Sequence, residues 1–162
     1  MNDTPEKQSG LWIINTNIAG SILFALSAVV AALVFEGISK VQGVVVALIL
    51  FSGGVVAFIW GYWTAVQRSR THEMSVAELY FLLGSAIPRR VKWVMNSCLL
   101  AQTTIALVTA LARGSTPDPG ADGGSSPGST LAFGVLVPLL GLGLNGLWAS
   151  THGDFPPRVT RQ

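Results

Sequence analysis

Four long apolar runs dominate the sequence and restrict the folds open to it. They cover residues 11–35, 44–66, 91–112 and 130–150, and none contains Asp, Glu, Lys or Arg apart from Lys92 near the start of the third. About 20 helical residues cross the roughly 30 Å of hydrocarbon in a bilayer, and a helix satisfies its own backbone hydrogen bonds there. The runs therefore predict an all-α membrane protein, a bundle of four transmembrane helices.

The composition agrees with a membrane protein and excludes several other classes. Half of the 162 residues are hydrophobic and only 11% are charged, which is unusual for a soluble domain. The net charge is +2 and the basic residues lie between the apolar runs, whereas a nucleic-acid binder needs a dense basic face. Cys98 is the only cysteine, so no intramolecular disulfide and no cysteine motif can form. We expect no nucleic-acid partner and no cofactor.

The connections between the runs differ in character. Residues 36–43 predict a tight turn, and residues 114–129, rich in Pro, Gly, Ser and Asp, predict a flexible loop. In the middle connection Ser75 and Glu78 have the spacing of a capping box. Apolar residues 79–83 follow, and Pro88 then provides a stop signal. This pattern predicts a short helix over residues 75–87 that lies along the bilayer surface or beneath the bundle.

Positive charge predicts the orientation. With four spans, eight of the ten basic residues share one side of the membrane: Lys7, Arg68, Arg70, Arg89, Arg90, Lys92, Arg158 and Arg161. Because such charge is retained in the cytoplasm, we expect both termini and the short helix to be cytoplasmic in a multi-pass protein of the inner (plasma) membrane. The five tryptophans map to the same helix ends and predict interfacial anchors: Trp12, Trp60, Trp63, Trp93 and Trp148.

Small and polar residues predict how the helices pair. Gly53, Ala57 and Gly61 recur at every fourth position and favour close helix contact, while Pro138 predicts a kink in the last helix. A polar face comprises Asn96, Gln102, Thr103 and Asn145. In an antiparallel pair, Asn96 and Asn145 fall at the same end, which predicts a contact between them. This polar face either joins helices or lines a pathway for an uncharged or lipid-like molecule.

Residues suited to catalysis or metal binding are few. His72, Glu73, Glu78, His152 and Asp154 would share the cytoplasmic side, but their spacing matches no metal or catalytic motif. An enzyme acting on a lipid headgroup would need His72 or His152. We expect no catalytic and no metal-binding residues. The candidates for contact with a partner or lipid are Arg68, Arg70, Arg89, Arg90 and Phe155, the last in a stiff tail that either docks on a partner or anchors the last helix.

The end of the chain carries a family resemblance. Residues 133–147, FGVLVPLLGLGLNGL, are followed by Trp148 and by HGDFPPR. Over roughly these final thirty residues the pattern resembles the ending of small, uncharacterised four-span membrane proteins predicted from actinobacterial genomes. The resemblance implies a cell-membrane setting and carries over no functional residues.

Taken together, these features favour an accessory or scaffold subunit of a larger membrane assembly. Its expected partners are the lipid bilayer and other membrane subunits or a second copy of itself, because small-residue faces suit helix pairing. No charged residue lies deep in a span, which disfavours an ion-coupled pump. The alternatives are a small transporter or channel and an enzyme acting on lipid headgroups.

Overall fold

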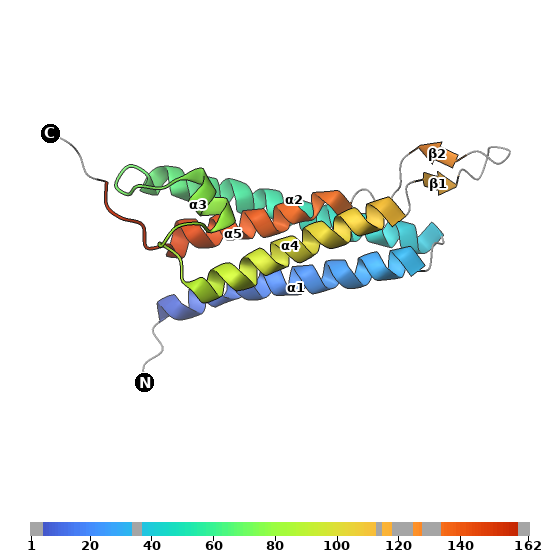
Figure 1. Cartoon of the computed structure of the whole chain (residues 1–162), viewed down its shortest axis with the longest axis horizontal. Helices are drawn as coiled ribbons and strands as arrows, with labels where there is room; N and C mark the ends of the chain where they lie inside the picture. Colours follow the sequence, from blue (N-terminus) through green and yellow to red (C-terminus); the bar gives the residue numbers. More distant parts are fainter. Residues whose placement is uncertain (1–4, 34–36, 113–114, 118–124, 128–133, 159–162) are drawn as a thin grey trace.

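The predicted all-α fold is confirmed. A computed structural model describes residues 5–33, 37–112, 115–117, 125–127 and 134–158. Its long helices are α1 (Pro5–Leu33), α2 (Gly37–Arg68), α4 (Arg89–Ala112) and α5 (Pro138–His152). Helices α1, α2 and α4 each contain a segment long and apolar enough to cross a membrane, and α5 lies within such a segment that begins at Gly134. The four helices form an elongated bundle (Figure 1).

The described ends of the chain lie at the same end of this bundle. Helix α1 begins there, α2 ends, α4 begins and α5 ends (Figure 1). We call this the terminal end. An even number of crossings requires this arrangement, and it groups the sequence-distant segments that bear most of the charged residues.

Helix α5 lies at the centre of the bundle. About 67% of its apolar window is buried, against 33%, 22% and 17% for the windows of α1, α2 and α4. Its most extensive contact is with α2, and it also packs on α1, α3 and α4. The three outer helices therefore present the apolar surface that faces hydrocarbon, whereas α5 meets mainly protein.

The last helix begins later than its apolar run suggests. A single turn over residues 134–136 precedes α5, and Pro138 is the first residue of the helix. Pro138 therefore starts α5 instead of kinking a longer helix, as a proline does readily because its missing N–H has no partner in a first turn. With 15 residues, α5 is only about 22 Å long.

The short helix in the middle connection is shorter than predicted. Helix α3 spans Val76–Phe81 and starts with the capping box of Ser75 and Glu78, as expected. It ends at Leu82, which adopts a left-handed conformation with φ of 53°, and Gly84 also has a positive φ of 81°. The segment therefore turns back into the bundle six residues before Pro88, and Leu79, Tyr80, Leu82 and Ile87 are buried.

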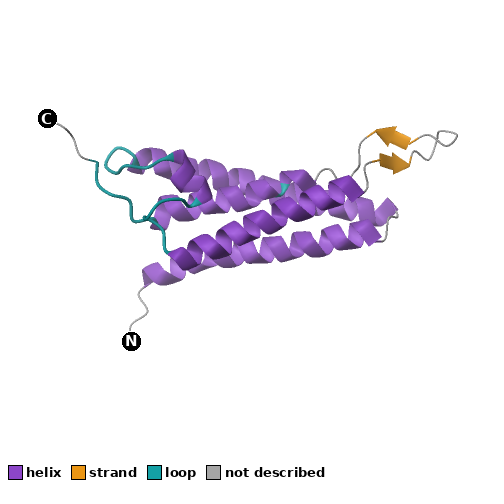
Figure 2. Ribbon diagram, in the orientation of Figure 1, coloured by secondary structure: helices purple, strands orange, loops and turns teal. Residues whose placement is uncertain are grey.

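The residues after α5 fold back over the terminal end (Figure 2). The N–H of Glu73 donates to Pro156 O at 2.9 Å, the N–H of Arg158 to Thr71 O at 2.8 Å, and the N–H of Asp154 to Ala86 O at 2.9 Å. The tail thus pairs with the segments on both sides of α3.

Two short strands occupy part of the connection predicted as a flexible loop. Strand β1 (Ser115–Pro117) pairs antiparallel with β2 (Ser125–Pro127), with Ser115 opposite Pro127. They project beyond the bundle at the end opposite the termini (Figure 2). The remainder of the predicted loop, and the start of the predicted fourth run, lie outside the described residues.

Candidate functional site

A polar layer joins three helices in the middle of the bundle. The side chain of Gln102 on α4 is fully buried. Its Nε2 donates to Asn17 Oδ1 at 3.1 Å and to Ser21 Oγ at 2.8 Å, both on α1, and its Oε1 accepts from the Gly141 N–H of α5 at 3.2 Å. Gln102 therefore uses both its N–H groups and its oxygen within the protein. We call Asn17, Ser21, Gln102 and Gly141 the middle layer.

Gly141 has a steric role in this layer. A Cβ atom at this position would lie 2.9 Å from Gln102 Oε1 and 3.1 Å from Leu99 Cδ1. Its backbone N–H belongs to the first turns of α5, where helix amides lack or share intrahelical partners. The absence of a side chain therefore lets the Gln102 amide approach the helix backbone and accept this hydrogen bond.

A second polar layer lies at the terminal end. Asn145 Nδ2 donates to Asn96 Oδ1 at 3.1 Å and to Tyr80 O at 3.0 Å, and Asn96 Nδ2 donates to Phe81 O at 3.0 Å. The predicted contact between Asn96 and Asn145 is confirmed. The two amides also satisfy carbonyls at the end of α3, which have no partner within that helix. We call Tyr80, Phe81, Asn96 and Asn145 the terminal layer.

The Tyr80 ring inserts between α2 and α5. It stacks on Phe58 with 4.4 Å between ring centroids, and its hydroxyl donates to Phe58 O at 3.4 Å. A Cβ on Gly146 would fall within 3.0 Å of the ring, so this glycine makes room for it. Burial raises the pKa of the Tyr80 phenol, with a further contribution from Tyr62.

Glycines bring α2 and α5 into backbone contact. A Cβ at Gly61 would lie 2.7 Å from Leu147 N, and one at Gly143 would overlap the carbonyl of Gly54. Gly61 and Ala57 are therefore interface residues, as predicted. Gly53 is not: it is exposed, and Gly54 takes its place at the interface. The contact face follows a spacing of three and four residues, not four alone.

Two polar residues differ from the predicted polar face. Thr103 donates its hydroxyl to Leu99 O, one turn back in its own helix, and makes no hydrogen bond to another helix among the described residues. Asn17 was not predicted, although it is fully buried and contacts Gln102. The signal was available, since Asn17 precedes Ser21 by four residues on the same helix face.

The tryptophans fall into two groups. The exposed fractions of Trp12, Trp60, Trp63 and Trp93 range from 54% to 75%, and their rings lie on the outer helices near the terminal end. Trp148 is only 6% exposed. It stacks on His152 at 5.6 Å and lies close to Gly10 of α1. The anchor interpretation therefore does not extend to Trp148, whose ring packs inside the protein.

The residues predicted to contact a partner or lipid also fall into two groups, those engaged within the protein and those that are exposed. Arg68 donates to Ser150 O at 2.7 Å and to Gly153 O at 3.1 Å, so its charge stabilises the C-terminal end of α5. Phe155 is 4% exposed within the hydrophobic core of the terminal end. Both are engaged within the protein, and the tail docks on its own chain. Arg70, Arg89 and Arg90 are exposed.

The imidazoles and carboxylates of the described residues do not assemble into a metal site. Within the described ranges no group of three or more His, Cys, Asp or Glu side chains is close enough to hold a metal ion. His72 forms a backbone bridge with Pro157, and its ring contacts Thr71. His152 contacts Thr151 and stacks on Trp148.

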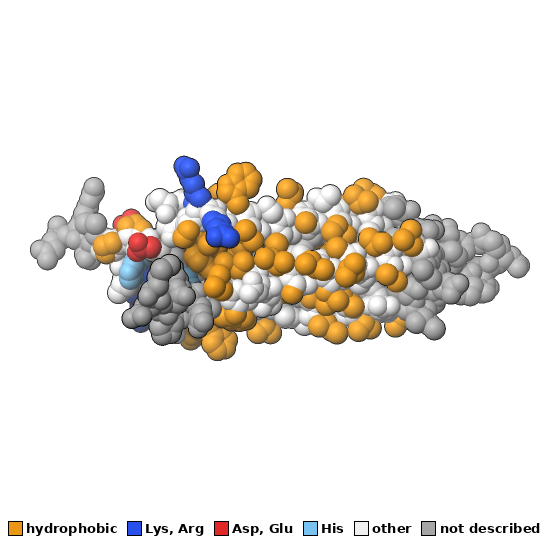
Figure 3. All heavy atoms as spheres, turned by 90° about the horizontal axis from the view of Figure 1, so that it is seen from below, with side chains coloured by type: hydrophobic (Ala, Val, Ile, Leu, Met, Phe, Trp, Pro, Cys, Tyr) orange, Lys and Arg blue, Asp and Glu red, His pale blue; other side chains and the backbone are white. Residues whose placement is uncertain are grey.

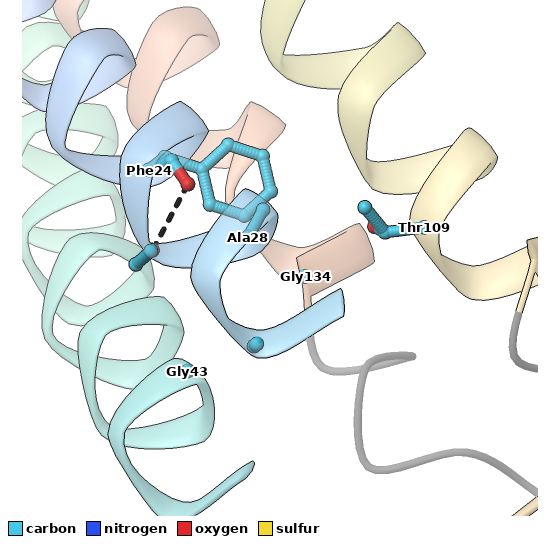
Figure 4. Close-up of a pocket in the computed structure, with 7 residues that line it drawn as sticks. Phe24, Ala28, Gly43, Thr109 and Gly134 are labelled. Carbon is cyan, nitrogen blue, oxygen red and sulfur yellow. Dashed lines mark hydrogen bonds between the residues drawn. The ribbon is translucent and has the colours of Figure 1, made fainter. Parts of the chain in front are cut away.

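An interior cavity lies towards the end opposite the termini. Its volume is about 10 Å³, and Figure 4 shows Phe24, Ala28, Gly43, Thr109 and Gly134 around it. A water molecule needs roughly this much space. The cavity is therefore too small for a transported solute in the conformation described.

The fold and its two polar layers define a multi-pass α-helical membrane protein with a buried central helix. The sequence matches no family model, no curated protein and no solved structure.

Proposed function

We propose that the protein is an accessory or scaffold subunit of a larger membrane assembly, with no catalysis of its own. The observation that carries this proposal is the set of hydrogen bonds that the interior amide side chains make within the protein. Gln102, Asn96 and Asn145 direct their N–H groups to protein acceptors on neighbouring helices or segments. Such bonds stabilise helix association in lipid, and the N–H groups used in this way are not free to bind a solute. Two buried amide atoms, Asn17 Nδ2 and Asn145 Oδ1, have no hydrogen-bond partner among the described residues.

The outer surface is compatible with the same proposal. Large apolar side chains cover the outer helices, including Ile49 and Val56 on α2 and Leu100 on α4, each more than 60% exposed. Since lipid and the apolar face of another subunit are equally suitable neighbours, this surface is suited to helix pairing at little cost.

Site-directed photocrosslinking tests the proposal. A photoreactive amino acid would replace Ile49, Val56 or Leu100, one at a time, in protein expressed in its native membrane. We expect the positions on one helix, either Ile49 and Val56 on α2 or Leu100 on α4, to give a single crosslinked protein band. The position or positions on the other helix should crosslink only to lipid. Purification in mild detergent should then recover the same partner, or a second copy of the chain. If every position labels only lipid and the protein purifies as a lone monomer, the proposal is wrong.

We also propose that the terminal end is cytoplasmic. Arg68, Arg70, Arg89, Arg90 and Lys92 lie at that end, and positively charged flanks are retained in the cytoplasm. Tags at the two termini should both resist an impermeant reagent in intact cells and react after lysis. Labelling of either tag in intact cells would contradict this orientation.

A further inference from the structure

We propose that a groove at the start of α4 binds the phosphate headgroup of an anionic phospholipid. The groove has a volume of about 330 Å³ and is lined by Leu82, Leu83, Gly84, Lys92, Trp93 and Asn96. One wall is therefore the turn after α3, and the other is the first two turns of α4. This inference is independent of the scaffold proposal, because it concerns a lipid ligand and not a protein partner.

The charge around the groove suits a phosphate. Arg89, Arg90 and Lys92 lie within four residues, and both arginines are exposed. Lys92 donates one hydrogen bond to Gly84 O, which leaves two of its three ammonium protons for a ligand. The carboxylate of Glu78, which lies close to Gly84, is held by the N–H and hydroxyl of Ser75. The groove thus has Lys92 in its lining and two exposed arginines close by in the chain, while the nearby carboxylate is already engaged.

The surface beyond the groove suits an acyl chain. Trp93 is 75% exposed, and Leu100, Leu107 and Leu111 follow on α4 with exposed fractions of 68%, 49% and 82%. Residues seven apart lie on nearly the same side of a helix, so this apolar stripe runs from the groove along the outside of the bundle. Figure 3 shows Lys and Arg side chains at one end of the long hydrophobic surface. A phospholipid has the same order of charged head and apolar chain.

A second groove provides a matched control. It lies at the end of α2, has a volume of about 370 Å³ and is lined by Trp63, Val66, Gln67 and Arg70. It also combines a tryptophan with an exposed apolar helix, but Arg70 is the only cation among its described lining residues, and the nearby Arg68 is bound to the carbonyls that end α5. Both grooves lie at the terminal end and each has one cation in its lining, but the first also has two exposed arginines, Arg89 and Arg90, in the same turn of α4.

Native mass spectrometry of the purified protein in detergent tests the proposal. The protein would be titrated with phosphatidylglycerol or phosphatidylcholine of the same chain length. We expect tighter binding of phosphatidylglycerol, and the combined substitution Arg89→Gln and Arg90→Gln should weaken its binding about 25-fold, since each cation near a membrane surface contributes about fivefold. Arg70→Gln should leave the affinity unchanged. Circular dichroism should show that all variants are folded, because the substituted side chains are exposed.

Three results would overturn the proposal. They are equal affinity for the two lipids, an equal loss in the Arg70→Gln variant, and displacement of bound phosphatidylglycerol by equimolar glycerol phosphate, which has the phosphate but no acyl chain. In native membranes, a photocrosslinker at Trp93 should label lipid. A protein crosslinked at this position would show that the groove is instead part of a subunit interface.

Discussion

The two sides of α5 are packed by different physical means. Towards α2 the contact depends on glycines, which have no Cβ. At Gly54, Gly61 and Gly143 the two backbones approach so closely that a Cβ would overlap the other helix. Towards α1 and α4 the contact depends on polar side chains, because Gln102 of α4 bonds to Asn17 of α1 and to the Gly141 N–H of α5. Added atoms at these glycines disrupt the first contact, whereas the second loses stability when a hydrogen-bond partner disappears.

The largest effect is expected on the glycine side. Gly143→Ala places a Cβ against the backbone carbonyl of Gly54, so the helices must separate. We expect a loss of about 3 kcal/mol in the free energy of unfolding, measured by titration with a denaturing detergent. Gly53→Ala is the matched control, since its Cβ would lie 3.9 Å from the nearest side-chain atom. Equal effects of the two substitutions would show that backbone contact is not what limits this interface.

The next effect is expected in the middle layer. Gln102→Met retains the volume of the side chain but removes three hydrogen bonds, to Asn17, Ser21 and Gly141. At roughly 0.6 kcal/mol for each hydrogen bond within a membrane, the loss should be about 2 kcal/mol. The same titration measures it. A variant as stable as the wild type would show that the amide does not join the helices.

A smaller effect is expected in the terminal layer. Asn145→Leu removes two hydrogen bonds, to Asn96 and to Tyr80 O, and should cost about 1 kcal/mol. Because Tyr80 O lies near the end of α3, the substitution should also speed hydrogen exchange of amides in α3 more than in α1. Uniform acceleration throughout the chain would contradict a local role for this layer.

The smallest effect is expected at Thr103. Its hydroxyl bonds only within α4, so Thr103→Val should change the free energy of unfolding by less than about 0.5 kcal/mol. This variant controls for loss of polarity in the same helix as Gln102. A loss as large as that of Gln102→Met would indicate that Thr103 bonds to another helix.

The sequence was sufficient for the number and type of the helices, because the length of an apolar run follows directly from bilayer thickness. It was also sufficient for the contact between Asn96 and Asn145, since position along two antiparallel helices determines which residues meet. The start of α5 was less predictable: the apolar run continues on both sides of Pro138, and only the structure shows that the proline begins the helix.

The other partners in the polar layers could not be read from the sequence. Tyr80 O, Phe81 O and the Gly141 N–H are backbone groups. Every residue type except proline has both a backbone N–H and a backbone C=O, so the residue type does not reveal which of them bonds to a side chain. Their availability depends on where a helix begins or ends. The interface at Gly54 was missed for a different reason. A repeat of exactly four residues drifts around a helix of 3.6 residues per turn, so it does not follow one face of the helix.

A double-mutant cycle between Gln102 and Asn17 tests most directly whether the interior amides join the helices. The free energy of unfolding would be measured for the wild type, Gln102→Met, Asn17→Leu and the double variant. The structure predicts a coupling energy of about 1 kcal/mol, in the range found for hydrogen bonds between membrane helices. Strictly additive effects would show that the two side chains do not interact and would contradict this role of the amides.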